Sequence, residues 1–371
     1  MLPEYQIFER NEKYLIIFPT ISFWFRTDLK GLIVLRNLRD GRIGKAEERL
    51  SKLIKEGSKK PGEKDYLLYL IEFEFSDYIE EKIDYFIEGV KDITGERCQI
   101  GCILDETDIK LEKMYSFLKR ERLDYIELNC KNKAVSKEFC EMLAKSEIDT
   151  IHFYNLSLNK DTEAALNKLK IGNKEIIIHI DALEAKEVIL EKIYYCSQRD
   201  YYIAFIWNVC IENYYETYKL IRKQCESLSW KIDYKKYCEV FNYDKIIKNR
   251  ESRCCCGIGK DKIYIDKQGY IFSCQDCSTE KVLLLGSIEE AEFKEVWKSG
   301  RVTSFLRNIS IDYIDGCNKC AVRYLCGGQC RMMSYKKNNK LNEKACFCEH
   351  EKRILMDLLW ENITENEQSI I

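Results

Sequence analysis

Hydrophobic and polar positions between residues 65 and 240 alternate between two periods. Short runs rich in Ile, Tyr and Phe are typical of strands, and the stretches between them place apolar residues at helical spacing. The expected strands are Tyr69–Phe75, Cys98–Leu104, Leu123–Leu128, Thr150–Tyr154, Glu175–Ile180 and Tyr201–Trp207. The helical patterns between them include Ile79–Ile93, Lys110–Lys119 and Ala182–Tyr194. Six βα units in a row predict a parallel sheet that curls into a partial barrel, because crossovers are right-handed and sequential strands pair.

The first 60 residues follow a different pattern. Tyr14–Phe18 and Ile21–Phe25 predict a hairpin with Pro19-Thr20 at its turn, and Leu29–Leu38 and Lys45–Ile54 have helical spacing. Such a small α+β module is either an ordinary packing module or a peptide-binding domain that accepts a leader peptide at a sheet edge. Composition alone favours the first interpretation, because edge exposure is not readable from one sequence.

Length and charge limit the class of protein. A chain of 371 residues has room for two or three domains, and its net charge of −2, with both signs mixed, argues against a nucleic-acid-binding face. The N-terminus shows no signal-peptide pattern, and no apolar run approaches the roughly 18 residues of a membrane span. We therefore expect a cytoplasmic protein, in which a cysteine-rich region favours a metal site over a disulfide framework.

Cysteines are concentrated near the C-terminus, where eleven of the nineteen lie in one stretch. The eleven are Cys254, Cys255, Cys256, Cys274, Cys277, Cys317, Cys320, Cys326, Cys330, Cys346 and Cys348. The spacing from Cys317 to Cys330 is C-x2-C-x5-C-x3-C, with Gly327 and Gly328 inside the last gap. Glycine tolerates the positive φ and the close backbone approach that convergent thiolates require. Two metal centres fit the ligand count, and tetrahedral zinc satisfies the same arithmetic as iron.

The residues also predict a hairpin within the cysteine-rich stretch and place two histidines inside strands. Lys262–Asp266 and Tyr270–Ser273 predict a β-hairpin with Gly269 at its turn. His152 and His179 lie inside expected strands, where a core or rim role is favoured over a ligand role.

The cysteine-rich stretch resembles the SPASM domain, the C-terminal extension of radical SAM enzymes that mature ribosomal peptides and sulfatases. The resemblance rests on the triple cysteine followed by Gly269 and Cys274, on the C-x2-C-x5-C-x3-C set, and on Cys348. The flanking segments Leu285-Gly286-Ser287-Ile288, Phe293-x3-Trp297 and Leu325-Cys326-Gly327-Gly328 match as well. It is specific over about residues 254–350. It extends more loosely over the βα units, as a radical SAM partial barrel, and over the N-terminal module, as a leader-peptide recognition element.

The resemblance implies two interleaved auxiliary 4Fe–4S clusters. The first would use one or two of the triple cysteines with Cys274 and, by crossing back, Cys330. The second would use Cys317, Cys320, Cys326 and Cys348. Cys277 and Cys346 are surplus, and either could supply a fourth ligand.

The implied fold class is α/β in four parts. Residues 1–62 form a winged-helix-like peptide-recognition module and 65–245 a degenerate partial (βα)6 barrel. Residues 250–352 form the cysteine-rich SPASM domain and 353–371 a C-terminal helix or tail.

The chain departs from the family where the reducing cluster would be held. Radical SAM enzymes carry C-x3-C-x2-C in the loop after the first strand, and here that loop reads Ser76-Asp77-Tyr78. The nearest approach, Cys98-x3-Cys102-x2-Asp105, has Asp as its third member. The glycine-rich turn after the second strand is also missing. We therefore expect no S-adenosylmethionine site and no catalytic residues of this kind.

Three hypotheses follow. The leading one is an accessory, pseudo-radical-SAM protein that binds a precursor peptide, a true radical SAM partner or both, as a heterodimer or homodimer. The second is an active maturase that uses an auxiliary cluster with an open iron. The third is a zinc-binding structural scaffold.

Overall fold

The computed structural model describes residues 2–21, 23–57, 68–105, 111–120, 123–207, 212–238, 258, 261–289, 293–298 and 309–361. The chain divides into two compact units. The first comprises residues 1–64, 243–256 and 307–371, and the second comprises 65–242 and 257–306. The triple cysteine at 254–256 is not among the described residues.

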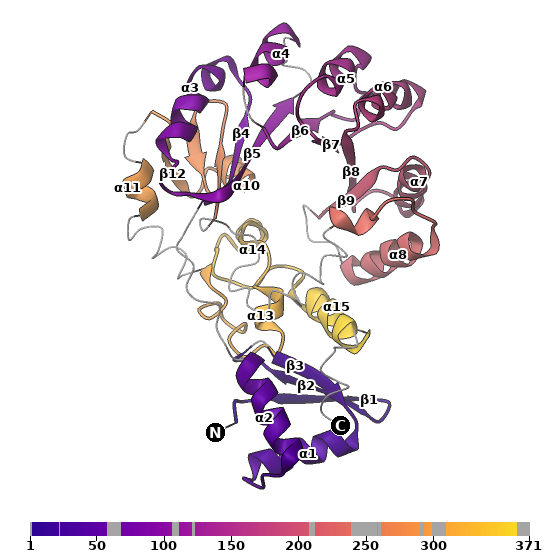
Figure 1. Cartoon of the computed structure of the whole chain (residues 1–371), viewed down its shortest axis with the longest axis vertical. Coiled ribbons are helices and arrows are strands. Elements are labelled where there is room, and N and C mark those ends of the chain that lie inside the picture. The colour runs from indigo at the N-terminus through magenta and orange to yellow at the C-terminus, as the bar shows by residue number, and fades with distance from the viewer. Residues whose placement is uncertain are drawn as a thin grey trace. The chain divides into compact units, whose positions relative to one another are not determined.

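A nine-stranded sheet forms the centre of the second unit, in the order β12-β11-β10-β4-β5-β6-β7-β8-β9. Its parallel strands are β4 (Leu68–Glu74), β5 (Thr94–Asp105), β6 (Tyr125–Asn129), β7 (Thr150–Tyr154), β8 (Glu175–Asp181) and β9 (Tyr202–Ile206). The helices are α3 (Asp77–Gly89), α4 (Leu111–Arg120), α5 (Lys137–Ala144), α6 (Lys160–Ile171), α7 (Lys186–Ser197) and α8 (Tyr214–Ser227), followed by the 3₁₀ turn η2 (Tyr234–Lys236). Helices α3 to α8 lie along the outer side of the curved sheet (Figure 1). The predicted succession of six βα units is confirmed.

The two faces of these parallel strands differ in polarity. Ile71 and Phe73 of β4 are fully buried, as are Ile126 and Leu128 of β6. The residues between them are polar, because successive side chains on a strand point to opposite faces. A parallel sheet is usually apolar on both faces, so a polar face on this one calls for a functional explanation.

The predicted hairpin extends the sheet of the barrel. It consists of β10 (Lys262–Ile265) and β11 (Tyr270–Phe272), and β11 also pairs with β12 (Leu284–Ser287). Strand β10 runs parallel to β4, with Ile263 opposite Ile71. The short helices α10 (Gln275–Thr279) and α11 (Phe293–Lys298) belong to the same unit.

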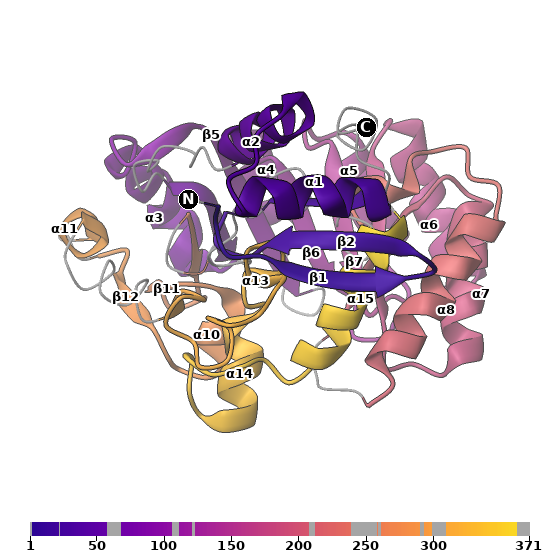
Figure 2. The same ribbon diagram turned by 90° about the horizontal axis from the view of Figure 1, so that it is seen from below.

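The first unit contains an antiparallel sheet of β1 (Gln6–Arg10), β2 (Lys13–Phe18) and β3 (Phe23–Thr27) and the helices α1 (Leu29–Arg39) and α2 (Lys45–Gly57). Figure 2 shows β1 and β2 side by side next to α1. The apolar core between sheet and helices includes Phe18, Phe25, Leu35 and Leu50, each fully buried. The sequence predicted β2, β3 and both helices.

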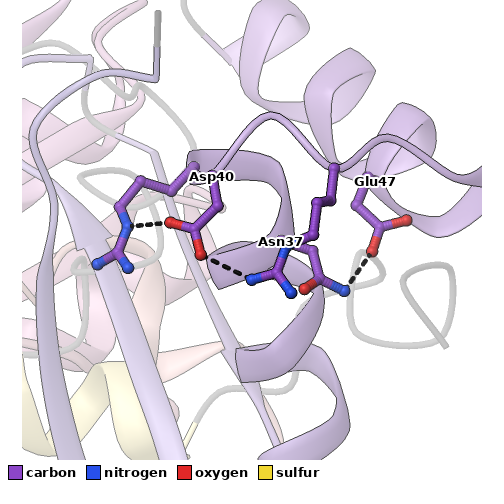
Figure 3. A network of polar contacts seen from close by, with 5 residues as sticks. Asn37, Asp40 and Glu47 are labelled. Atoms are coloured by element: carbon purple, nitrogen blue, oxygen red, sulfur yellow. Dashed lines mark hydrogen bonds and ion pairs between the residues drawn. The ribbon is translucent and has the colours of Figure 1, made fainter.

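The turn between α1 and α2 is held by polar contacts (Figure 3). Asn37 Nδ2 donates to Glu47 Oε1 at 3.1 Å, which ties the end of α1 to the start of α2. Asp40 accepts hydrogen bonds from Arg39 Nε at 3.0 Å and from Arg42 Nη2 at 2.7 Å. These contacts fix the angle at which the second helix meets the first.

The same unit holds the C-terminal helices α13 (Arg323–Cys326), α14 (Arg331–Asn338) and α15 (Cys348–Glu361). Arg26 of β3 donates to the backbone carbonyl of Trp360, and Arg10 of β1 forms an ion pair with Asp357 at 3.6 Å. Helix α15 thus begins at a cysteine and contacts the N-terminal sheet near its other end. Among the described helices, none combines the length and the apolar character that crossing a bilayer requires.

Candidate metal centre

Electrostatic interactions connect four thiols of the first unit, those of Cys317, Cys320, Cys326 and Cys348. Cys326 ends α13 and Cys348 begins α15. Burial raises the pKa of Cys348 to about 11, and the neighbouring sulfurs of Cys317 and Cys320 add to the effect. Burial also raises the pKa of Cys326, and Cys348 and Cys320 again contribute. These are the four residues assigned by resemblance to the second cluster.

The donor set suits a metal–thiolate centre. The raised pKa values keep the thiols of Cys317, Cys326 and Cys348 protonated at neutral pH without a metal, and a bound metal would take its cysteine ligands as thiolates. Within the described ranges, no three His, Cys, Asp or Glu side chains stand close enough to hold a single metal ion. A cube of four irons takes one thiolate on each iron, so its ligand sulfurs stand further apart than those around one ion. Four thiols are the donor set that such a cluster requires.

The backbone between Cys326 and Cys330 adopts the conformation that its glycines predict. Gly327 has φ +63°, Gly328 +81° and Gln329 +62°, so three successive residues are left-handed. This turn points the Gly328 amide at the Cys326 thiol, with which it forms a hydrogen bond that favours the thiolate.

The remaining candidate ligands are spread over both units. Cys274 and Cys277 lie in the second unit with their sulfurs 3.3 Å apart, and Cys277 is fully buried. Cys330 precedes α14 in the first unit. Cys346 takes part in a disulfide bond. Cys254, Cys255 and Cys256 lie outside the described residues, so the proposed composition of the first cluster stays a prediction.

The connection between β4 and α3 consists of Phe75 and Ser76 and contains no cysteine. Ser76 caps α3 by accepting from the Ile79 amide at 3.2 Å, and its hydroxyl donates to the Lys267 carbonyl at 2.9 Å. The Lys267 amide donates in turn to Glu74 Oε2 at 3.2 Å. The turn of the β10–β11 hairpin is thus bonded to the point where a radical SAM enzyme would carry its three cysteines.

Cys98 and Cys102 do not replace that motif. Both lie within β5 (Thr94–Asp105), whose pairing with β4 is irregular between Thr94 and Gln99 and regular from Gln99 on. Burial and the Asp124 carboxylate raise the pKa of Cys98 to about 11, and burial raises that of the fully buried Cys102. Asp105 stands at the third position of the spacing, so these two thiols do not make up the three that such a cluster needs.

Sequence reasoning missed a polar network on the face of the sheet that the helices do not cover. Nδ1 of His152 lies 2.9 Å from Nε2 of His179, and the Tyr154 ring stacks on His179 at 3.7 Å. The Tyr154 hydroxyl lies 3.3 Å from Glu127 Oε1, to which it donates. The two histidines, interpreted singly as core or rim residues, are therefore partners on adjacent strands.

A second tyrosine–glutamate pair belongs to the same face. The Tyr125 hydroxyl of β6 donates to Glu72 Oε1 of β4 at 2.7 Å, although β5 lies between the two strands. Burial and the Glu72 carboxylate raise the pKa of Glu127 to about 8. Burial lowers the pKa of His152 to about 4, and burial together with His152 lowers that of His179. The signal that could have revealed this face is polar residues at alternate positions of consecutive strands.

Comparison with known proteins identifies the class of the C-terminal part. Residues 255–321 match the family model of SPASM, an iron–sulfur cluster-binding domain. A comparison with curated protein sequences finds no match.

Three solved structures of Streptococcus suis SuiB share the fold of the chain. SuiB bound to S-adenosylmethionine gives a TM-score of 0.54 at 11% identity, covering 92% of this chain and 97% of that one. SuiB without a stated ligand gives 0.53 at 12% identity, with the same coverage. SuiB bound to the precursor peptide SuiA gives 0.55 at 11% identity, covering 91% of this chain and 98% of that one. The chain therefore has the α/β fold of SuiB and an iron–sulfur cluster-binding domain.

Proposed function

We propose that this protein is an iron–sulfur accessory protein of a ribosomal peptide maturation system. It holds two auxiliary 4Fe–4S clusters and binds a precursor peptide, a radical SAM partner protein or both. Cys317, Cys320, Cys326 and Cys348 hold one cluster. Cys274, Cys330 and one or two of the triple cysteines hold the other, with a fourth ligand from Cys277, or from Cys346 after reduction of its disulfide bond.

The observation that carries the accessory role is the β4–α3 connection. A cluster that cleaves S-adenosylmethionine needs three thiolates, so that a fourth iron site stays open for the cofactor. The two residues of this connection supply none, and Ser76 is engaged in capping α3 and in bonding the hairpin turn. The cluster-binding domain is retained, as the match over residues 255–321 supports. Together these features favour a protein that carries auxiliary clusters without generating a radical.

Peptide binding is supported by the likeness to SuiB bound to its precursor peptide, which covers 91% of this chain. In our proposal the N-terminal module, residues 1–62, accepts the peptide as an additional strand of its three-stranded sheet. Strands β1 and β3 are the edges of that sheet. An edge strand offers unpaired backbone donors and acceptors that an extended peptide can use.

Metal analysis of protein purified without oxygen tests the cluster assignment. We expect about eight irons per chain, as two four-iron clusters require. The variant Cys326→Ala should retain about four, because one of the two clusters loses a ligand. Cys225→Ala is the control, since Cys225 is a buried cysteine of α8, in the other unit, and is not among the proposed ligands. Zinc in place of iron, or full iron in Cys326→Ala, would refute the assignment.

A further inference from the structure

Arg331 is the largest fully buried side chain of the protein's described part, with no exposed surface. Its Nε donates to the Gln329 carbonyl at 3.2 Å, and its Nη1 donates to the carbonyls of Leu341 at 3.3 Å and Glu343 at 2.8 Å. All three acceptors are neutral. Among the described residues no carboxylate forms an ion pair with Arg331, so its charge is buried without a counter-charge there.

One nitrogen of this guanidinium, Nη2, has no hydrogen-bond partner among the described residues. Buried donors are nearly always satisfied, and an exception calls for an explanation such as a bound group. Nη2 lies beside the cysteine turn, because a Cβ placed on Gly328 would be 3.3 Å from it. The amide of the same Gly328 donates to the Cys326 thiol, and the Arg331 charge acts on the thiol of Cys317. The free N–H groups therefore lie beside the turn that follows Cys326, and the charge of the same side chain acts on Cys317.

A 4Fe–4S core bound by four thiolates carries net negative charge in its common oxidation states. Hydrogen bonds to the sulfurs and nearby charge set its reduction potential. We propose that Arg331 Nη2 donates a hydrogen bond to a sulfur of the cluster held by Cys317, Cys320, Cys326 and Cys348. This buried cation offsets the charge of the cluster and makes its reduction easier. The proposal rests on the proposed function and adds a residue outside the cysteine set to its metal centre.

The first test measures the contact in the unaltered protein. Wild-type protein labelled with ¹⁵N-arginine is loaded with iron and sulfide without oxygen, reduced with dithionite, and studied by pulsed EPR. We expect a ¹⁵N coupling to the reduced cluster, and it should persist in labelled Arg323→Met. Arg323 is the matched control, because it is close to the same cysteines in sequence and its buried Nε also has no partner among the described residues, but its Nη1 donates to the Asn318 carbonyl and its guanidinium lies over the Tyr324 ring. Absence of any ¹⁵N coupling overturns the proposal.

The second test measures the consequence. In Arg331→Met, one of the two midpoint potentials should become more negative, or its cluster should be lost with about half of the iron. Arg323→Met should keep both potentials and all of its iron. Full iron and two unchanged potentials in Arg331→Met overturn the proposal and leave the proposed function intact. A wild-type protein that binds no iron defeats the proposed function itself, so the two failures are distinguishable.

Discussion

Among the residues of the polar network, Glu127 has a carboxyl group whose pKa is raised to about 8. Its carboxyl group faces the Glu72 carboxylate and accepts from the Tyr154 hydroxyl. Two carboxylates that share a poorly solvated site cannot both ionise cheaply, so one retains its proton near neutral pH. The network is therefore a set of mostly neutral donors and acceptors that also contains an exchangeable proton.

This behaviour predicts a pH dependence of stability. The folded-state pKa of Glu127, about 8, lies above the 4.5 of an unperturbed glutamate, so the folded protein binds this proton more tightly than the unfolded chain. Its contribution to the free energy of unfolding is full below pH 4.5 and is lost as the pH rises towards 8. We expect the melting temperature to fall between pH 6.5 and 8, and Glu127→Gln to weaken that dependence.

The pH window separates Glu127 from its histidine neighbours. The pKa of His152 is lowered to about 4 and that of His179 is also lowered, so both affect stability as the pH falls below about 6.5. Melting curves of wild type and Glu127→Gln are compared by circular dichroism from pH 6.5 to 8, below the range in which the raised thiol pKa values affect stability. An identical slope in wild type and Glu127→Gln would show that the carboxyl group is ionised throughout this range.

At this scale, the sequence yields a prediction for the cysteines, which stays a prediction, whereas it did not reveal the polar network. The cysteine pattern from Cys317 to Cys330 is local in sequence, so the spacing alone indicates that these side chains are close together. The pairing of His152 with His179 depends on the register of β7 against β8, which no local pattern encodes. The two glycines were predicted to permit positive φ, and both have it.

Strand β5 shows how a single element allows the network to form. Gly101 lies opposite Glu72 on one side and Tyr125 on the other. A Cβ at this position would stand 2.5 Å from the Tyr125 hydroxyl oxygen, a distance that side chains do not tolerate. The missing side chain lets the Tyr125 ring cross β5 and reach Glu72.

The variant Gly101→Ala should therefore force the Tyr125 ring out of its place. We expect a loss of roughly 1–3 kcal/mol in the free energy of unfolding, as overpacking typically costs. Urea unfolding followed by tryptophan fluorescence measures it. The matched control is Gly89→Ala at the exposed end of α3, where a Cβ would meet nothing within 4 Å and stability should stay equal or rise. Equal stability of Gly101→Ala and wild type would mean that the ring is not fixed across the strand.

The elements themselves were largely predictable where their signal is local. The six expected barrel strands coincide with β4 to β9 to within a few residues at their ends. Strand β1 was missed because its sequence, QIFER, contains no apolar run. None of its residues is buried. The hairpin was predicted, but its parallel pairing with β4 joins residues nearly 200 positions apart, which periodicity does not report.

For the whole molecule, the question is whether the protein can bind and cleave S-adenosylmethionine. The chain shares its fold with SuiB, which has been crystallised with S-adenosylmethionine. Yet its β4–α3 connection has two residues and no thiol, and the β10–β11 turn is bonded to it. Its C-x3-C pair near the start of the barrel, Cys98 and Cys102, lies within one strand and has Asp105 in place of a third cysteine.

These features predict that the iron-loaded protein does not cleave S-adenosylmethionine. Incubation with dithionite and S-adenosylmethionine, followed by chromatography, should give no 5′-deoxyadenosine above a protein-free mixture. The result counts only if the same sample contains its full iron and an active radical SAM enzyme turns over beside it. If 5′-deoxyadenosine did accumulate, loss of turnover in Cys98→Ser would trace it to the β5 thiols, and retention would trace it to a cluster of the SPASM part. In either case an open iron would exist where the sequence provides no C-x3-C-x2-C motif, and the accessory role would have to be abandoned for an enzymatic one.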